Sequence, residues 1–135
     1  MINVGVIGSG GIFRDLHLPY YAMSKKAKIV AVADVNEASA KEIAERCGAV
    51  HWFTDYRELI KLEQIDAVDV CTHPAPHRDI AVAAARAGKH VLVEKPMCRT
   101  SAEARELVEI ARRRGVPLQV GHIERFNPAI LAIRP

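Results

Sequence analysis

The sequence predicts an α/β fold built on a doubly wound parallel β-sheet, and three observations predict it. Six short apolar runs, most of them rich in Val and Ile, recur along the chain and alternate with segments of helical periodicity. Nearly continuous apolarity is typical of strands that are buried on both faces, as strands of parallel sheets are. The clearest helical segments each end at a glycine, so the chain consists of repeated strand–helix units. At 135 residues it has the length of one domain.

The expected strands are short, and most are separated by enough residues for a helix. The first apolar run leads directly into a glycine-rich loop, and the second ends in an acidic residue. In chain order the six runs are residues 2–8, 28–34, 50–53, 67–72, 90–94 and 117–121. We expect ligands at the carboxyl ends of these strands, as in other open α/β sheets.

The clearest predicted helix follows Thr100 and ends at Gly115, whose backbone can adopt the left-handed stop. Thr100 and Glu103 have the spacing of a capping box. The apolar stripe expected to face the core consists of Ala104, Leu107, Val108 and Ala111. Two further helices are predicted within residues 35–48 and 77–88, which also end in glycine.

Composition excludes several classes of protein. Half of the residues are apolar, 26% are charged and the net charge is +3, which is too small to suggest binding to nucleic acid. No apolar stretch approaches the roughly 20 residues of a membrane span. Cys47, Cys71 and Cys98 are far apart and form no CxxC pair, which suits a reducing compartment. We therefore expect a cytoplasmic protein without nucleic-acid or membrane partners.

The loop after the first strand has part of a dinucleotide-binding fingerprint. Gly8 would make the tight turn and Gly10 would let the backbone approach a pyrophosphate, while Gly11 and Ile12 begin a helix with free amide groups. Phe13 occupies the place of the third glycine, which predicts wider spacing between helix and strand but no blocked phosphate site. Taken alone, the loop fits a glycine turn without a ligand equally well.

Asp34 favours the dinucleotide interpretation. It ends the second strand a little over 20 residues after the loop, where a carboxylate accepts hydrogen bonds from the adenosine ribose hydroxyls. Asp34 or Asn36 could also cap the helix that follows. A carboxylate repels a 2′-phosphate and residues 35–37 contain no Arg or Lys, so NAD is favoured over NADP.

A metal site is not expected. Cys71, His73 and His77 are residue types that bind metals, and the two histidines are four residues apart. Pro74 and Pro76 lie between them and prevent the helix that would align the two rings.

Two longer stretches, "GKHVLVEKPM" and "CTHPAPHRDIAVAAARAGKH", resemble the Gfo/Idh/MocA family of sugar and polyol dehydrogenases, whose first domain has a Rossmann fold. The match is carried by residues 94–96 (Glu-Lys-Pro), by Thr72, Pro74 and His77 in the loop after the fourth strand, by residues 17–19 (His-Leu-Pro) and by the tail "VGHIERFNPAI". His73 departs from the loop pattern, since it stands where proline commonly follows threonine. Within the family, the sequence is most similar to the branch that acts on nucleotide-linked amino sugars, such as UDP-N-acetylglucosamine 3-dehydrogenases.

The resemblance implies roles for several residues. Lys95 is the expected catalytic residue, placed near the nicotinamide and the reacting hydroxyl of the sugar, where a cation stabilises a developing alkoxide. Pro96 follows it in a turn whose proline is often cis in this family. His17 is expected near the cofactor phosphates or in the core. The remaining cofactor contacts implied are Thr72, His73, Pro74 and His77 at the riboses, and Glu94 and Arg125 at the nicotinamide. Asn36 beside Asp34, and Lys95 and Pro96 in the turn, are also expected to contact the cofactor.

The resemblance also implies how the chain is organised. Residues 1–121 are the expected dinucleotide-binding domain, and residues 122–135 begin the transition to a C-terminal substrate domain that these 135 residues lack. We therefore expect part of an NAD-dependent oxidoreductase acting on a sugar, polyol or nucleotide-sugar hydroxyl. A non-catalytic NAD-binding or sensing module and a Rossmann-like module without nucleotide are the alternatives. A sheet face left exposed without the second domain predicts self-association into a homo-oligomer.

Overall fold

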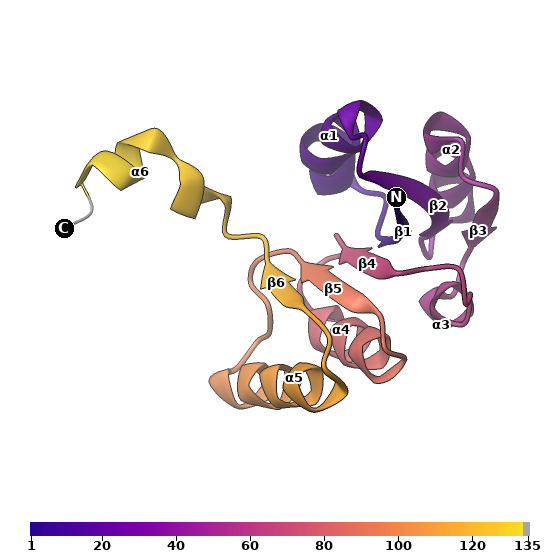
Figure 1. The fold of residues 1–135 in the computed structure, drawn as a ribbon. Helices are drawn as coiled ribbons and strands as arrows, with labels where there is room; N and C mark the ends of the chain where they lie inside the picture. The colour runs from indigo at the N-terminus through magenta and orange to yellow at the C-terminus, as the bar shows by residue number, and fades with distance from the viewer. Residues whose placement is uncertain (134–135) are drawn as a thin grey trace.

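The computed structural model describes residues 1–133 and contains one six-stranded parallel β-sheet (Figure 1). The sheet has the strand order β3-β2-β1-β4-β5-β6, which reverses between β1 and β4. The strands are β1 (Ile2–Ile7), β2 (Ala27–Ala33), β3 (His51–Phe53), β4 (Ala67–Val70), β5 (His90–Val93) and β6 (Leu118–Val120). The predicted doubly wound α/β fold is confirmed.

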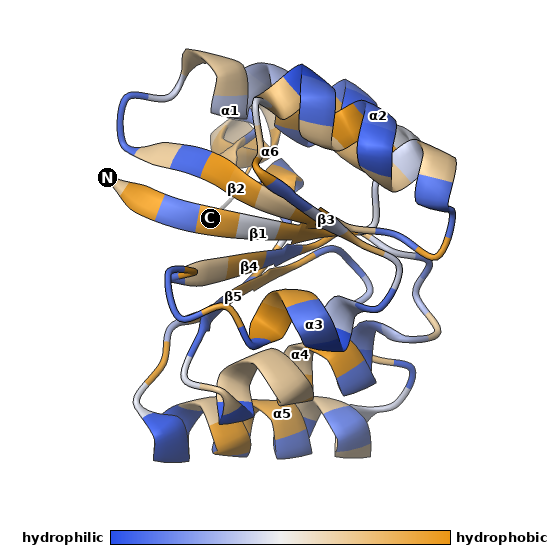
Figure 2. Ribbon diagram, turned by 90° about the vertical axis from the view of Figure 1, so that its right-hand side faces the viewer, coloured by the Kyte–Doolittle hydropathy of each residue, from blue (hydrophilic) through white to orange (hydrophobic). Residues whose placement is uncertain are grey.

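Helices cover both faces of this sheet (Figure 2). They are η1 (Phe13–His17), α1 (Leu18–Met23), α2 (Glu37–Cys47), α3 (Tyr56–Ile60), α4 (His77–Arg86), α5 (Ser101–Arg114), η2 (Ile123–Phe126) and α6 (Pro128–Ile133). The helices α1 and α2 lie on one face, and α3, α4 and α5 lie on the other (Figure 2). The core accordingly forms two apolar clusters, one on each side of the sheet.

The predicted helix ends are largely confirmed. Thr100 and Glu103 form the full capping box of α5, and the Asn36 side chain caps α2 by accepting a hydrogen bond from the Ser39 amide. Gly48, Gly88 and Gly115 all have positive φ angles just after α2, α4 and α5. These glycines end the helices because they adopt left-handed backbone without the steric cost of a Cβ atom.

The predicted core stripe of α5 is wrong at one position. Leu107 and Ala111 are buried as expected, but Val108 is 51% exposed. Ile110 packs against the core instead. The sequence shows that a helix has an apolar side, but the neighbouring elements determine which of its residues face the core.

The first helix is irregular where the fingerprint departs from its usual pattern. Phe13 is fully buried and packs with Val4, Val6 and Leu18 between this helix and the sheet. The segment that it begins has π-helical backbone, and Pro19, the second residue after this segment, has no amide hydrogen to donate to the preceding turn. A wide turn of this kind places Phe13 in the core and leaves His17 at the edge of the sheet.

The C-terminal segment lies apart from this core. Neither η2 nor α6 contains a buried residue, and α6 extends away from the sheet (Figure 1). The boundary at residue 121 stays a prediction, and residues 134 and 135 of the predicted transition segment lie outside the described residues. Between residues 1 and 133 there is no helix of the length and apolarity needed to cross a membrane.

Candidate functional site

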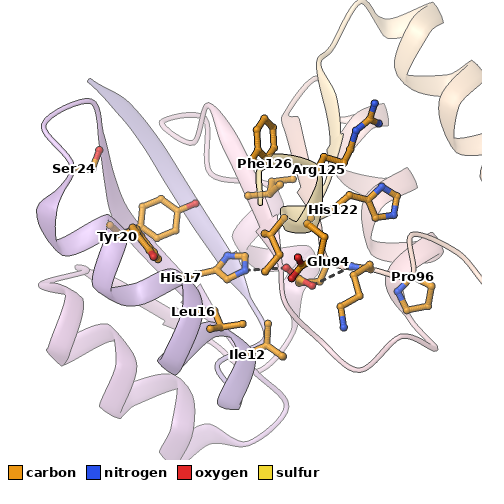
Figure 3. Close-up of a pocket in the computed structure, with 16 residues that line it drawn as sticks. Ile12, Leu16, His17, Tyr20, Ser24, Glu94, Pro96, His122, Arg125 and Phe126 are labelled. Atoms are coloured by element: carbon orange, nitrogen blue, oxygen red, sulfur yellow. Dashed lines mark hydrogen bonds and ion pairs between the residues drawn. The ribbon is translucent and has the colours of Figure 1, made fainter. Parts of the chain in front are cut away.

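Two grooves open at the carboxyl edge of the sheet, which is where ligands bind in folds of this class. The smaller groove, of about 350 Å³, is lined by residues that follow β1, β2 and β4, on either side of the point where the strand order reverses. The larger groove, of about 1450 Å³, lies beyond the ends of β5 and β6, and residues of η1, α1 and η2 form its walls (Figure 3).

Gly8 brings the glycine loop against the end of β4. Its φ angle is +95°, and a Cβ atom added there would lie 2.6 Å from the Cys71 carbonyl carbon and the Thr72 nitrogen. Gly10 differs, because a Cβ atom there meets no protein atom within 4 Å. Both glycines line the smaller groove. Packing within the protein therefore requires glycine at position 8. At position 10 the protein itself has room for a side chain, so glycine would be required there only to make room for a ligand. Gly11, the third glycine of the loop, lines neither groove.

The Asp34 carboxylate is fixed at the mouth of this loop. It accepts hydrogen bonds from the Ser9 amide (2.7 Å) and the Ser9 hydroxyl (2.8 Å), and its other oxygen accepts one from the Asn36 amide (2.9 Å). Asp34 lines the smaller groove, whereas Asn36 does not and instead caps α2. The predicted ribose anchor thus lies beside the predicted pyrophosphate loop.

Arg14 lies beside the glycine loop, although it lines neither groove, and it was not predicted from the sequence. Its Nε donates to the Ser9 carbonyl (2.8 Å), and one terminal nitrogen donates to the Ser39 hydroxyl (2.9 Å). Both terminal nitrogens also donate to the carboxylate of Glu42 in α2, and these hydrogen bonds, together with the charge of Glu42, raise the pKa of Arg14. A cation therefore lies near Asp34, although residues 35–37 contain none. Residues 35–37 directly follow β2, whereas Arg14 approaches Asp34 from the helix that follows β1.

The loop after β4 divides into residues that line the smaller groove and residues that do not. Thr72 and His73 line it, whereas Pro74 and His77 line neither groove. The His77 ring is buried, with its nitrogens 3.0 Å from the Thr72 carbonyl oxygen and 2.8 Å from the Pro96 carbonyl oxygen. His77 therefore ties the loop after β4 to the turn after β5.

The Glu-Lys-Pro stretch that follows β5 lies in the larger groove. Glu94 is 8% exposed, Lys95 and Pro96 are exposed, and the peptide bond between Lys95 and Pro96 is cis. One Glu94 oxygen accepts from the Lys95 amide (3.2 Å). A Cβ atom at Gly121 would lie 2.5 Å from the other Glu94 oxygen, so glycine at this position leaves room for the carboxylate.

Ile12 and Arg125 also line the larger groove, on opposite sides of it (Figure 3). Ile12 precedes η1, and Arg125 belongs to η2. Of the residues expected at the cofactor, those that meet at the smaller groove are Gly8, Gly10, Asp34, Thr72 and His73. Those that line the larger groove are Ile12, Glu94, Lys95, Pro96 and Arg125. Those that line neither groove are Gly11, Asn36, Pro74 and His77.

A buried charged network lies beneath the larger groove. His17 donates from Nδ1 to Asp69 (2.8 Å), and its Nε2 lies 3.1 Å from Glu94 (Figure 3). The Tyr21 hydroxyl (3.1 Å) and the Cys71 thiol (3.3 Å) donate to the same Asp69 carboxylate. The hydrogen bond to Asp69 raises the pKa of His17, against the effect of its burial.

The other two donors to Asp69 are neutral. Burial, followed by the charge of Asp69, raises the pKa of both the Tyr21 hydroxyl and the Cys71 thiol. The sequence analysis missed Asp69, although a charged residue within an otherwise apolar run was a usable signal.

These contacts also bear on the metal question. In His17, Asp69 and Cys71, the atoms that could bind a metal lie within 4.8 Å of one another. The hydrogen bonds among these three side chains explain why the atoms are so close. The fold does not bring Cys71, His73 and His77 together as a ligand set. Both ring nitrogens of His77 face backbone carbonyl oxygens instead.

Comparison with known proteins identifies this architecture. Residues 2–122 match the family model GFO_IDH_MocA, described as an oxidoreductase family with an NAD-binding Rossmann fold. Inositol 2-dehydrogenase 2 of Saccharopolyspora erythraea is 36% identical over 134 residues, which make up 98% of this chain and 40% of the relative. Levoglucosan dehydrogenase of Pseudarthrobacter phenanthrenivorans is 34% identical over 136 residues, with 96% of this chain and 35% of the relative covered.

Solved structures agree with these relatives. A 3-ketoreductase from Actinomadura kijaniata in complex with NADP superimposes with a TM-score of 0.92 at 32% identity, covering 98% of this chain and 42% of that one. A probable dehydrogenase from Thermotoga maritima gives a TM-score of 0.88 at 33% identity, covering 93% and 38%. The chain thus spans about two fifths of the length of these relatives. The chain belongs to the Gfo/Idh/MocA family of oxidoreductases, and residues 2–122 form that family's NAD-binding Rossmann domain.

Proposed function

We propose that this domain binds NAD(H) across the carboxyl edge of its sheet, and that the protein containing it transfers a hydride between NAD and a hydroxyl group of a sugar, polyol or nucleotide-sugar. The observation that carries the proposal is the contact between Asp34 and the glycine loop through Ser9. It brings a ribose acceptor and a pyrophosphate-binding backbone to one groove, and a dinucleotide requires both at that separation.

The two grooves divide the cofactor between them. The adenosine half would lie in the smaller groove, with its ribose hydroxyls on Asp34 and its pyrophosphate on the loop at Gly10. The nicotinamide half would lie in the larger groove near Glu94 and Arg125. Thr72 and His73, in the loop after β4, also line the smaller groove.

Lys95 is the proposed catalytic residue of this chain. Its side chain is exposed in the larger groove, beside the buried Glu94 carboxylate. An ammonium group there would orient the reacting hydroxyl and stabilise the negative charge that develops on its oxygen as the proton is lost, before hydride leaves the carbon to give the carbonyl. The base that takes the hydroxyl proton is not assigned to a residue of this chain.

The cofactor preference follows from the charge at the ribose. The Asp34 carboxylate repels a 2′-phosphate, whereas the Arg14 guanidinium near it is already paired with Glu42. We therefore propose that NAD binds more tightly than NADP, even though the related 3-ketoreductase was crystallised with NADP. The substrate class is proposed from the polyol and sugar names of the relatives, with a nucleotide-linked amino sugar as the narrower expectation.

We further propose that the protein is a cytoplasmic homo-oligomer. The three cysteines are free thiols, as suits a reducing compartment. Apolar side chains around the larger groove are exposed, among them Phe126 (73%) and Tyr20 (70%), and exposed apolar patches of this kind favour association. Sedimentation at rising protein concentration checks the second point, and a species that stays monomeric would contradict it.

The experiment that tests the proposed function is a calorimetric titration of the chain with NADH and, separately, with NADPH. We expect binding of NADH, weaker binding of NADPH, and loss of the NADH signal in Asp34→Ala. Asp79→Ala removes an exposed carboxylate of α4 that lines neither groove, so this variant is the matched control and should bind as the original chain does. Failure of the folded chain to bind either dinucleotide would contradict the proposal.

A further inference from the structure

The carboxylate of Asp69 lies in the interior and faces three hydrogen-bond donors. Its side chain is 1% exposed, and it accepts hydrogen bonds from His17, Tyr21 and Cys71. A buried carboxylate needs a compensating positive charge, since taking an unpaired ion out of water costs several kcal/mol. Among these three donors only His17 can carry that charge, because a phenol or a thiol is either neutral or negative.

The second nitrogen of the same ring gives an independent reason to expect a charge on His17. Its Nε2 lies 3.1 Å from an oxygen of Glu94, while Nδ1 lies 2.8 Å from Asp69. A neutral imidazole has one donor and one acceptor nitrogen, so it cannot donate to two carboxylates at once. Both contacts are satisfied together when both nitrogens carry protons.

Glu94 is confined on its other sides as well. Its second oxygen accepts from the Lys95 amide, and the absence of a side chain at Gly121 leaves the space that the carboxylate occupies. Its side chain is 10% exposed, and that of His17 is 13% exposed. The carboxylate therefore meets the larger groove at a fixed place, and His17 is the side chain that holds it there (Figure 3).

We propose that His17 is a positioning residue: it is held as an imidazolium between Asp69 and Glu94 and fixes the Glu94 carboxylate on the floor of the larger groove. The consequence for the cofactor rests on the proposed function, since this groove is where the nicotinamide is expected. When His17 loses its proton, one of the two carboxylates loses its donor. Glu94, the partner nearer to solvent and at the longer distance, is then released.

The charged and titratable groups that face His17 come from each element packed against it. They are Tyr21 in α1, Asp69 in β4, Cys71 directly after β4, and Glu94 directly after β5. Two of these are acids that stabilise the imidazolium, and the other two are neutral donors to Asp69. The pH at which Glu94 is released is therefore set by the loss of the proton from His17.

The first measurement uses the full chain labelled with ¹⁵N and needs no cofactor. Long-range ¹H–¹⁵N spectra between pH 5 and 10 report the protonation of each nitrogen of His17. We expect both nitrogens to stay protonated above the ordinary imidazole pKa of 6.5, and Asp69→Asn to lower the midpoint. Loss of the proton near pH 6.5 in the unsubstituted chain would overturn the proposal, whether or not NADH binds.

The second measurement tests whether His17 acts through Glu94. NADH affinity is measured against pH for the unsubstituted chain, for His17→Gln, for Glu94→Gln and for the double variant. Each single variant should weaken binding about tenfold, the double variant should lose no more than either, and both singles should lose the pH dependence. Losses that simply multiply in the double variant would overturn the positioning role. His90→Gln, at the exposed opposite end of β5, is the matched histidine control and should leave binding unchanged.

Unfolding in urea keeps this test separate from the proposed function. The same four proteins give a coupling between His17 and Glu94 in stability, so the positioning role can be judged even if NADH does not bind. A protonated His17 coupled to Glu94 in a chain that binds no dinucleotide would support the positioning role and contradict the proposed function. If His17→Gln does not fold, Glu94→Gln keeps the buried pair with Asp69. It should lower the His17 midpoint, and an unchanged midpoint would overturn the proposal.

Discussion

Three glycine-to-alanine substitutions distinguish glycines that the protein requires for its stability from a glycine that is required for binding a dinucleotide. Gly48 has a φ angle of +67° and open space where a Cβ atom would lie, so alanine there costs only the left-handed conformation, about 1 kcal/mol. Gly8 combines a φ angle of +95° with a Cβ position 2.6 Å from backbone atoms of Cys71 and Thr72. Alanine at Gly8 should therefore cost about 3 kcal/mol or more.

The additional loss of stability expected at Gly8 arises because the neighbouring backbone of Cys71 and Thr72 cannot move away from an added Cβ atom. The Cys71 amide donates to the Ile7 carbonyl (2.8 Å), so moving the end of β4 away from the loop breaks the pairing of β1 with β4. Gly10→Ala has neither difficulty, because its φ angle is not in the left-handed region and a Cβ atom meets nothing within 4 Å. Its stability should change by less than about 0.5 kcal/mol.

Urea unfolding and NADH titration of the same three variants complete the comparison. We expect Gly10→Ala to unfold like the original chain yet to bind NADH at least about tenfold more weakly, a loss of about 1.4 kcal/mol, because its methyl group takes the space of the pyrophosphate. Gly48→Ala should show the reverse pattern, with lower stability and unchanged binding. Unimpaired NADH binding by Gly10→Ala would refute the assignment of the loop to the pyrophosphate.

Three further predictions concern the core and the charged network. The raised pKa of His17 contributes stability that is fully present below pH 6.5 and is lost as the pH rises through the folded-state pKa. The unfolding free energy should therefore fall over that range and become less pH-dependent in Asp69→Asn, and an unchanged pH profile in that variant would contradict the pairing. Phe13→Ala should cost about 3–5 kcal/mol in urea unfolding, because the ring is fully buried, and a loss below about 1 kcal/mol would mean that the first helix does not pack on it. Gly121→Ala should displace the Glu94 carboxylate, lowering the His17 titration midpoint in NMR spectra, and an unmoved midpoint would show that the carboxylate has room elsewhere.

The fold could be predicted because its signals are local. Each buried strand is visible as a short apolar run, and each of the three longest helices carries its own stop signal in Gly48, Gly88 or Gly115. The short α3 was not predicted, since five residues give too little periodicity to recognise. The exposed Val108 was mispredicted for a related reason. The local pattern shows that the helix has an apolar side, whereas the neighbouring elements determine which residues face the core.

The smaller groove of the candidate site could be predicted to a similar extent. Gly8, Gly10 and Asp34 are tied to strand ends, and the spacing along the chain places strand ends at one edge of a parallel sheet. Arg14 was missed because its contacts with Ser9 and Ser39 depend on how the first helix faces α2. Its position near the ribose anchor is a property of packing between two helices.

The larger groove depends on contacts that no local pattern contains. His17 is 52 residues from Asp69 and 77 residues from Glu94, and its Nδ1 and Nε2 each face one of those carboxylates. Phe13 and His17 are the first and last residues of the π-helical segment, and the centroids of their rings lie 6.3 Å apart. A small residue at position 13 would remove that neighbour of the His17 ring and leave a cavity in the core. A variant with glycine at position 13, as in the usual fingerprint, should therefore disturb His17 as well as the core.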